Sequence, residues 1–249
     1  MERRPGLIAA VMTVRDEVDI IAACIEHHAA EGVDRFYIVD HGSTDGTSAV
    51  LADLKGRFDM RVTRDDRPHH HQPEVTSLLA RQAFGDFALF VVAVDADEFF
   101  ISTRRDERLC DTLRRQPEHV RKCYARSYRH LDPWRREEVP RPHPKVAFRP
   151  SPLVHVWNGN HDVDIEGYAW GEIEVREWQY RSLDHFRAKV RKQLATLDPA
   201  LRLDDATHVR RYGAMTDEEL EAEWVKLSTV PSVRDPIPSL CSSLVTDLS

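Results

Sequence analysis

The sequence has no apolar run long enough to cross a membrane as a helix. Such a crossing needs about 20 consecutive apolar residues, whereas the longest apolar stretch, around residues 87–94, has the length of a buried strand. The short apolar segment at residues 7–12 lacks a small-residue cleavage site, so we expect no signal peptide. We therefore expect a cytoplasmic protein without a transmembrane segment, for which peripheral association with a membrane stays open.

Cysteine is also scarce. The four cysteines lie far apart and none belongs to a C-x-x-C pair, which argues against a zinc ribbon, a redox pair or a dense disulfide framework. We expect these thiols to be reduced and mostly buried: Cys24, Cys110, Cys123 and Cys241.

An excess of positive charge is missing as well. The 249 residues carry 35 Lys and Arg against 42 Asp and Glu, which gives a net charge of −7. This balance argues against a nucleic-acid-binding protein, because such proteins neutralise phosphates with basic surfaces. With 41% hydrophobic residues the chain can bury a core of its own, and we find no internal repeat.

The sequence does contain an alternation of strand and helix patterns in its first 105 residues. Amphipathic segments that predict helices lie between short apolar runs that predict strands at residues 7–14, 36–40, 60–64 and 88–94. Such alternation predicts an α/β fold in which helices flank both faces of a mostly parallel central sheet.

Beyond residue 105 the pattern changes. A short helix to about residue 116 precedes strand-like segments at residues 122–130, 145–148, 153–157 and 172–180. The proline-rich stretch 133–152 is expected to be largely irregular. A helix begins at Ser182, and Thr216 with Glu219 forms a capping box for another. The second half is therefore predicted to be α+β with C-terminal helices.

Acidic side chains follow three of the predicted strands. The carboxyl ends of parallel strands meet at one edge of a sheet, where open α/β sheets bind ligands. Carboxylates there can hold a divalent cation or accept hydrogen bonds from the base and ribose of a nucleotide. The alternative is that each acid only begins a solvated loop. The residues are Asp16 and Glu17, then Asp40 and Asp45, then Asp95 and Asp97.

Three further candidates lie in the second half. His161 occurs in a polar turn and could complete a metal site through an imidazole nitrogen, or it could belong to an ordinary surface loop. Arg181 and Lys189 lie at a helix start and its following turns, where cations and backbone N–H groups can hold a diphosphate. The alternative for these two is a solvated basic face.

Several segments together resemble one known family. The acidic stretch 14–21, the turn 37–47, the Asp-Ala-Asp-Glu-Phe sequence at 95–99 and the segment 180–189 are similar to glycosyltransferase family 2-like proteins of the GT-A fold. The subgroup with an Asp-x-Asp-Glu-Phe motif fits best. The resemblance covers residues 7–100 and scattered pieces of 145–192, and the combination is more specific than any single motif.

The resemblance implies a GT-A-like nucleotide-binding fold and a metal cofactor. Asp97 would ligate a divalent ion, Mn²⁺ or Mg²⁺, and Asp95 would contact the ribose or a metal-bound water. His161 resembles a later metal-site histidine of the family. The nucleotide-sugar donor would be held by Asp16 or Glu17, Asp40, Asp45, Asp95, Arg181 and Lys189.

The function implied is transfer of a sugar from a nucleotide-sugar donor to an acceptor hydroxyl, metal-dependent and with inversion. The acceptor would be a glycan, a lipid-linked group or another hydroxyl compound, and not a nucleic acid. Removing the acceptor proton requires a base. The available carboxylates in the second half are Asp162, Asp164, Glu166 and Glu172.

Two other functions stay open. A nucleotidyltransferase would use the same acids and metal, although the first turn lacks a glycine-rich phosphate loop. A non-catalytic nucleotide-sugar or glycan-binding module is suggested by Glu177, which stands where many relatives have His.

We expect one domain over residues 1–227. Its nucleotide-binding half would span about 5–105, its acceptor half about 106–200 and its helical extension about 201–227, followed by a loosely ordered tail at 228–249.

Overall fold

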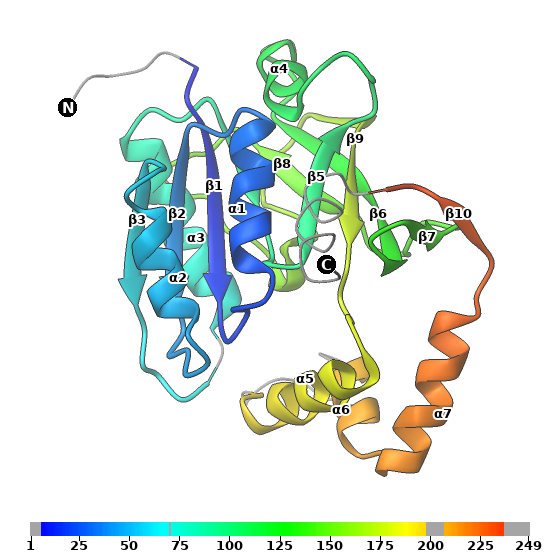
Figure 1. Ribbon diagram of the computed structural model, residues 1–249. Coiled ribbons are helices and arrows are strands. Elements are labelled where there is room, and N and C mark those ends of the chain that lie inside the picture. The colour runs from blue at the N-terminus through cyan, green and yellow to red at the C-terminus, as the bar shows by residue number, and fades with distance from the viewer. Residues whose placement is uncertain (1–5, 70, 198–206, 237–249) are drawn as a thin grey trace.

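The computed structural model describes residues 6–69, 71–197 and 207–236. In these ranges the strands join into one sheet (Figure 1). The strands are β1 (Ile8–Val14), β2 (Arg35–Asp40), β3 (Met60–Arg64), β4 (Phe90–Ala93), β5 (Glu98–Ser102), β6 (Lys122–Asp132), β7 (Arg135–Glu137), β8 (Lys145–Phe148), β9 (Tyr168–Glu177) and β10 (Ser232–Arg234). The helices are α1 (Ile21–Ala30), α2 (Thr47–Leu54), α3 (Gln72–Gly85), α4 (Leu109–Arg114), the 3-10 turn η1 (Asn158–Asn160), α5 (Leu183–Ala195), α6 (Thr207–Gly213) and α7 (Asp217–Ser228).

Four parallel strands form one half of the sheet. β1 pairs with β2 on one side and with β4 on the other, and β3 pairs with β2 as the outermost strand. Val14 lies beside Asp40 in this register, so the strands end together. We call this end of the sheet, with residues 15–19, 40–47 and 94–98, the carboxyl edge. The α/β prediction of a mostly parallel central sheet with flanking helices is confirmed.

The other half of the sheet is mixed. β8 pairs antiparallel with β4, and β6 pairs antiparallel with β8. β9 then runs parallel to β6 and antiparallel to β5. In this register Glu98 at the start of β5 lies beside Glu177 at the end of β9. The last residues of β9 therefore return to the carboxyl edge, although they lie 80 positions later in the chain than the acids that follow β4.

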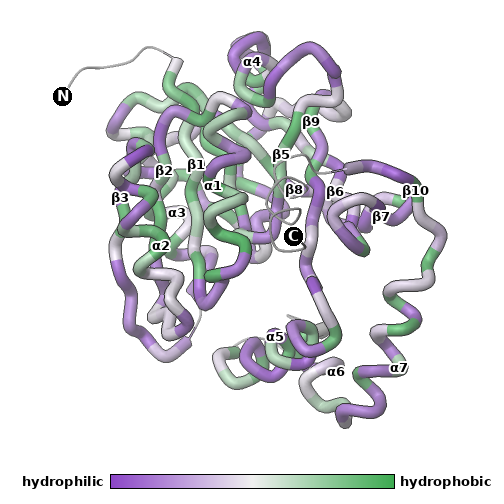
Figure 2. The backbone as a smooth tube through the Cα atoms, viewed as in Figure 1, coloured by the Kyte–Doolittle hydropathy of each residue, from purple (hydrophilic) through white to green (hydrophobic). Residues whose placement is uncertain are grey.

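Alternating side chains of the strands enter two cores. On one face Ile8, Ala10 and Met12 of β1 pack in a cluster that also contains residues of α1 and α2. On the other face Ala9 and Val11 pack in a cluster with residues of α3. This period of two is expected for a strand that is covered on both sides. In Figure 2 the hydrophobic stretches gather in the central strands and the hydrophilic ones in the loops.

A separate set of helices lies beyond the carboxyl edge. The chain leaves β9 and forms α5, α6 and α7, which we call the C-terminal arm; in Figure 1 the arm lies below the point where β1 ends. Its small core contains Tyr180, Phe186, Val190 and Leu220. Thr216 and Glu219 form the predicted capping box of α7. The arm thus has its own packing and presents α5 to the sheet.

One local prediction is wrong, and two short strands were not predicted. Residues 153–157 form no strand beyond an isolated bridge between Val156 and Val163. The stretch 133–152 is irregular apart from the predicted strand β8 and the short β7, and β10 at the start of the tail pairs with β7. Short, exposed, charged strands of this kind carry no apolar alternation from which they could be predicted. The rest of the tail, 237–249, lies outside the described residues, and the division into halves stays a prediction.

Three cysteines are buried and free, as expected: Cys24, Cys110 and Cys123; Cys241 lies outside the described residues. None of the helices in the described ranges is long and apolar enough to cross a membrane.

Candidate functional site at the carboxyl edge

The turn after β1 is bonded to the turn after β2. Asp16 adopts a positive φ of 49°, a conformation that Asp tolerates better than most residues. Its Oδ1 accepts hydrogen bonds from the backbone N–H groups of Thr44 and Asp45, and its own N–H donates to Ser43 Oγ at 2.9 Å. Burial raises the pKa of Asp16, but the bonds from Lys192 and Thr44 outweigh burial and leave it lowered. Asp16 is therefore an ionised part of the turn.

Asp40 and Asp45 are also bonded to their own turn. Asp40 is buried; its Oδ1 accepts from the N–H of Ser43 at 2.9 Å and its Oδ2 accepts from the hydroxyl of Ser48. Burial raises the pKa of Asp40, and these bonds lower it by more. Asp45 is exposed and accepts from Thr47 N–H at 2.9 Å at the start of α2. Both carboxylates hold the turn in shape, and of the two only Asp45 is open to solvent.

The acids that follow β4 are bonded to residues from distant parts of the chain. Lys145 Nζ at the start of β8 lies 3.0 Å from Asp95 Oδ2 and 2.5 Å from Glu98 Oε1. Asp95 Oδ1 accepts from Gln72 Nε2 at 2.9 Å and Asn160 Nδ2 at 3.0 Å. Burial raises the pKa of Glu98 well above its usual value, whereas the neighbouring acids hold the pKa of Lys145 up despite burial. Asp95 and Glu98 therefore share one buried ammonium group.

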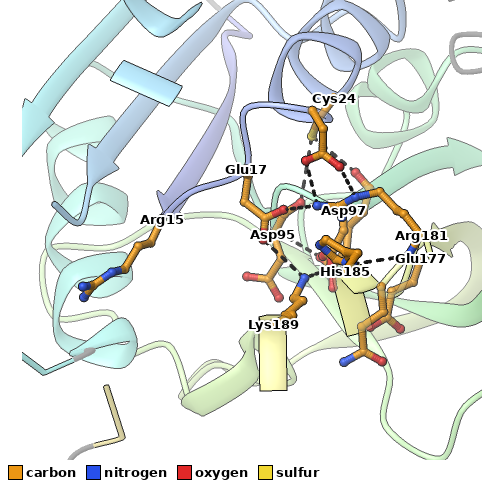
Figure 3. A network of polar contacts seen from close by, with 12 residues as sticks. Arg15, Glu17, Cys24, Asp95, Asp97, Glu177, Arg181, His185 and Lys189 are labelled. Carbon is orange, nitrogen blue, oxygen red and sulfur yellow. Dashed lines mark hydrogen bonds and ion pairs between the residues drawn. The ribbon is translucent and has the colours of Figure 1, made fainter. Parts of the chain in front are cut away.

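A second ammonium group lies between Asp97 and Glu17. Lys189 Nζ of α5 is 2.6 Å from Asp97 Oδ2 and 3.2 Å from Glu17 Oε1 (Figure 3). The three side chains are 13%, 9% and 14% exposed, so the contact is nearly closed to water. Burial raises the pKa of Asp97, but Lys189 outweighs it and brings the pKa to about 2. Burial lowers the pKa of Lys189, and the two carboxylates raise it by more. Asp97 and Lys189 are therefore both charged at neutral pH.

Arg181 and Lys192 attach the arm to the same loop. Arg181 lies 2.7 Å from Glu17 Oε2 and 2.6 Å from Asp19 Oδ2, and Lys192 lies 2.7 Å from Asp16 Oδ2. The Nη1 of Arg181 is buried and has no hydrogen-bond partner in the part of the chain that the structure describes. A buried donor without an acceptor is costly, so this atom is suited to an anionic ligand.

The predicted metal set, Asp95, Asp97 and His161, is not assembled by the structure. His161 Nδ1 donates to the Pro144 carbonyl at 2.8 Å, and burial together with Lys145 lowers the pKa of His161 to about 4. The two aspartates are already paired with different lysines. In residues 6–69, 71–197 and 207–236 no group of three or more His, Cys, Asp or Glu could hold a metal ion. The donor set in this arrangement does not fit a divalent ion.

Two of the four candidate bases are occupied by other partners. Asp162 accepts from Lys122 Nζ and Tyr124 Oη, each at 2.7 Å. Glu172 lies in the middle of β9, 2.8 Å from Arg115. It precedes Glu177 by five residues on one strand, or about 16 Å. The structure therefore does not bring Glu172 to the carboxyl edge.

The other two candidate bases are exposed. Asp164 accepts from Trp157 Nε1 at 2.8 Å, and Glu166 lies in the loop before β9. Glu177, in contrast, is buried at the carboxyl edge, where its Oε2 accepts from Ser127 Oγ at 3.2 Å and lies 3.6 Å from Arg141 Nε. The position at which the chain departs from the resembled family is therefore part of the site.

Several residues of the site were not found from the sequence. Lys145, Gln72 and Asn160 surround Asp95, and Asp19 holds Arg181. Lys145 precedes the apolar residues Val-Ala-Phe, and a charged residue at the end of a strand does not by itself indicate a functional site. Only the pairing of β8 with β4 places it beside the acids.

A parallel sheet with charged groups gathered at its carboxyl edge is typical of α/β enzymes that bind nucleotides. The profile of glycosyltransferase family 92 matches residues 8–221. The chain belongs to this family and is an enzyme, a glycosyltransferase. The predicted class of enzyme is confirmed, whereas the family 2-like label and the Asp-x-Asp-Glu-Phe subgroup are not. The comparison with curated protein sequences finds no significant match.

Solved structures with a similar fold include TarS of S. aureus. The similarity has a TM-score of 0.52 at 13% identity and covers 88% of this chain and 43% of that chain. A shorter TarS, residues 1–349 in complex with UDP, has a TM-score of 0.49 at 12% identity, with 84% and 70% covered. Glucosyl-3-phosphoglycerate synthase from Mycobacterium tuberculosis, in complex with Mn²⁺, UDP and glucosyl-3-phosphoglycerate, has a TM-score of 0.33 at 18% identity, with 50% and 44% covered. At these identities the likeness to TarS concerns the fold.

Proposed function

We propose that the chain binds a nucleotide sugar at the carboxyl edge and transfers the sugar to the hydroxyl group of an acceptor. The observation that carries this proposal is the meeting of Arg181 and Lys189 with the acids of the edge. These cations come from the arm, and a diphosphate is the anionic part of a nucleotide sugar that they would bind. The nucleoside would lie along the turns after β1 and β2, where the exposed Asp45 is available as an acceptor.

Two donor atoms favour a diphosphate at this place. Arg181 Nη1 is a buried N–H donor without a partner in the described residues. Lys189 has three N–H donors, of which Asp97 and Glu17 accept two. The third donor of Lys189 and the Nη1 of Arg181 could therefore bond phosphate oxygens placed beside them without losing their present bonds.

The reaction is written as a single in-line displacement. The acceptor oxygen forms a bond to C1 of the sugar, while the bond between C1 and the diphosphate oxygen breaks and its electron pair goes to the diphosphate. One displacement inverts the configuration at C1. Arg181 and Lys189 stabilise the charge that develops on the leaving group. Asp164, which is exposed and follows Asn160 at the edge by four residues, is proposed as the base that takes the proton of the acceptor; Glu166 precedes β9 and so lies farther from the edge than Glu172.

The sequence also predicted dependence on a divalent metal ion. The carboxylates of the edge are paired with lysines and do not form a metal-ligand set in the described residues. In this step Arg181 and Lys189 therefore supply the positive charge that faces the diphosphate.

A donor panel tests the proposed function. UDP-, GDP-, CDP- and dTDP-sugars are screened by thermal shift, since a ligand that binds the native state raises its apparent stability. Release of the nucleoside diphosphate is then measured with acceptors pooled from a cell extract. We expect one donor class to stabilise the chain and to be turned over. Arg181→Gln should lower donor affinity by about tenfold or more, whereas Arg135→Gln, an equal loss of charge on β7, should not.

The outcomes separate the alternatives. If no nucleotide sugar binds, the proposed site is refuted. Binding without release of nucleoside diphosphate would favour the non-catalytic module, and release of pyrophosphate from a nucleoside triphosphate would favour a nucleotidyltransferase.

A further inference from the structure

The contact between Lys189 and two carboxylates has the arrangement of a bound cation. Asp97 comes from the turn after β4 and Glu17 from the turn after β1, and both direct an oxygen at the same Nζ atom (Figure 3). Two carboxylates from two strand ends are a typical pair of ligands for a hard divalent ion. In this chain the position between them is occupied by an ammonium group.

The position of Lys189 is built by the fold. Phe186 and Val190 of the same helix are fully buried in the small core of the arm, so α5 cannot rotate without disrupting that core. On either side of Lys189, Arg181 and Lys192 bind the loop after β1. The ammonium group is therefore held by packing and by two flanking ion pairs, unlike a lysine on a solvated face.

The charges of the surrounding groups are nearly balanced. Asp97, Glu17 and Asp19 face Lys189 and Arg181, so the acids exceed the cations by one. A divalent ion bound by the two carboxylates would have to displace Lys189 and leave its buried charge without a partner, which is costly. A diphosphate at the same place would meet the N–H donors of Lys189 and Arg181, which are already in position.

From this geometry we infer that Lys189 takes the place of a divalent metal ion, so that its ammonium group neutralises the leaving diphosphate and nucleotide binding needs no metal. The inference rests on the proposed function for the identity of the ligand. It differs from the expectation raised by the resemblance, in which Asp97 ligates Mn²⁺ or Mg²⁺. Lys189 is then a catalytic residue, because it contacts the departing group, and Glu17 and Asp97 are positioning residues for its ammonium group.

The first arm of the test uses Mn²⁺ alone and no nucleotide. Binding of Mn²⁺ is followed by electron paramagnetic resonance of the free ion for the full chain, for Lys189→Met and for Lys226→Met. Lys226 lies on α7, is 73% exposed and supplies an equal loss of charge away from the edge. We expect Mn²⁺ binding only in Lys189→Met, where the two carboxylates are uncovered. Mn²⁺ binding by the parent with the same affinity as the variant would overturn the inference.

The second arm measures UDP and GDP affinity by calorimetry with Mn²⁺ or with EDTA. We expect the parent to bind UDP or GDP with the same affinity in Mn²⁺ and in EDTA. Lys189→Met should lose about tenfold or more of this affinity in EDTA and should recover part of it with Mn²⁺. Lys189→Arg, which keeps the charge, should stay independent of metal. A parent whose affinity rises about tenfold with Mn²⁺ would overturn the inference. If Lys189→Met does not fold, the parent with Mn²⁺ or EDTA and Lys189→Arg still decide the question.

The two proposals fail in different ways. If neither nucleotide binds the parent under any condition and the donor panel is also negative, the proposed function fails. If a nucleotide binds only with Mn²⁺, the proposed function stands and the role given to Lys189 is wrong.

Discussion

The acids of the carboxyl edge fall into two groups that differ in the origin of their partners. Asp40 and Asp45 are bonded mainly by Ser43, Ser48 and Thr47, within eight positions along the chain. Their distant contacts are a bond from Val18 N–H to Asp45 at 3.1 Å and Arg64 at 3.5 Å from Asp40. Asp97 and Asp95 are bonded by lysines 92 and 50 positions away. The first group shapes a turn, and the second brings opposite charges together where a ligand would bind.

This difference indicates what each group contributes. A carboxylate held by nearby backbone N–H and hydroxyl groups stabilises local structure whether or not a ligand is bound. A carboxylate paired with a distant cation depends on the whole fold and can exchange that partner when an anion or a cation arrives. We therefore propose that the first group mainly shapes the turns, with the exposed Asp45 open to a nucleoside, and that the second group takes part in ligand binding.

The largest loss of stability is expected when a buried carboxylate loses its distant lysine partner. Lys145→Met leaves Glu98 fully buried without its cation, which should lower the free energy of unfolding by about 3–5 kcal/mol. Urea denaturation measures the loss. In the double variant Lys145→Met/Glu98→Gln, which also removes the acid, we expect much of the stability to return. A loss under about 1 kcal/mol in the single variant would show that Glu98 is neutral or hydrated.

Lowering the pH is expected to change the stability of the protein through a buried histidine, His28, and not only through the carboxylates. His28 is fully buried; its Nδ1 donates to the Cys24 carbonyl and its Nε2 accepts from Phe100 N–H, so the ring is neutral. Burial and His27 lower the pKa of His28 to about 3. The unfolded chain binds this proton below about pH 6.5 and the folded chain does not, so stability should fall as the pH is lowered.

The measurement is urea denaturation from pH 7 to pH 4.5 for the parent and His28→Gln. Relative to the variant, the parent should lose about 1.4 kcal/mol per pH unit below about pH 6.5. Burial raises the pKa of Glu98, which gives a slope of opposite sign in both proteins and cancels in the difference. Parallel curves for the two proteins would mean that His28 is charged in the folded chain.

A smaller loss of stability is expected when Asp40, which is bonded mainly within its own turn, is changed. Asp40→Asn keeps the shape of the side chain but replaces one acceptor oxygen by a donor, so we expect a loss of about 1 kcal/mol in stability. Nucleotide affinity should change less than in Lys189→Met. If instead Asp40→Asn abolishes nucleotide binding at unchanged stability, the carboxylate contacts the ligand directly and the contrast between the two groups is wrong.

The local features of the molecule could be predicted from the sequence, and the long-range ones could not. The four parallel strands, the cap at Ser182 and the Thr216–Glu219 box follow from patterns within a few residues. The same holds for the acids at the strand ends. That Lys145 meets Glu98, or that Lys189 meets Asp97, depends on strand order and on the return of β9, which no local pattern encodes. For this reason the position of Lys189 between Asp97 and Glu17 could not be predicted from the sequence.

The most direct test of the account is a crystal structure of the chain with Mn²⁺ and the nucleoside diphosphate that binds most tightly in the donor panel. We predict the diphosphate at the carboxyl edge, with Lys189 Nζ in hydrogen-bonding distance of Asp97, Glu17 and a phosphate oxygen, and Arg181 Nη1 bonded to the same group. A manganese ion between Asp97 and the diphosphate, with Lys189 turned away, would contradict the role assigned to this lysine, and a nucleotide bound elsewhere would contradict the site itself.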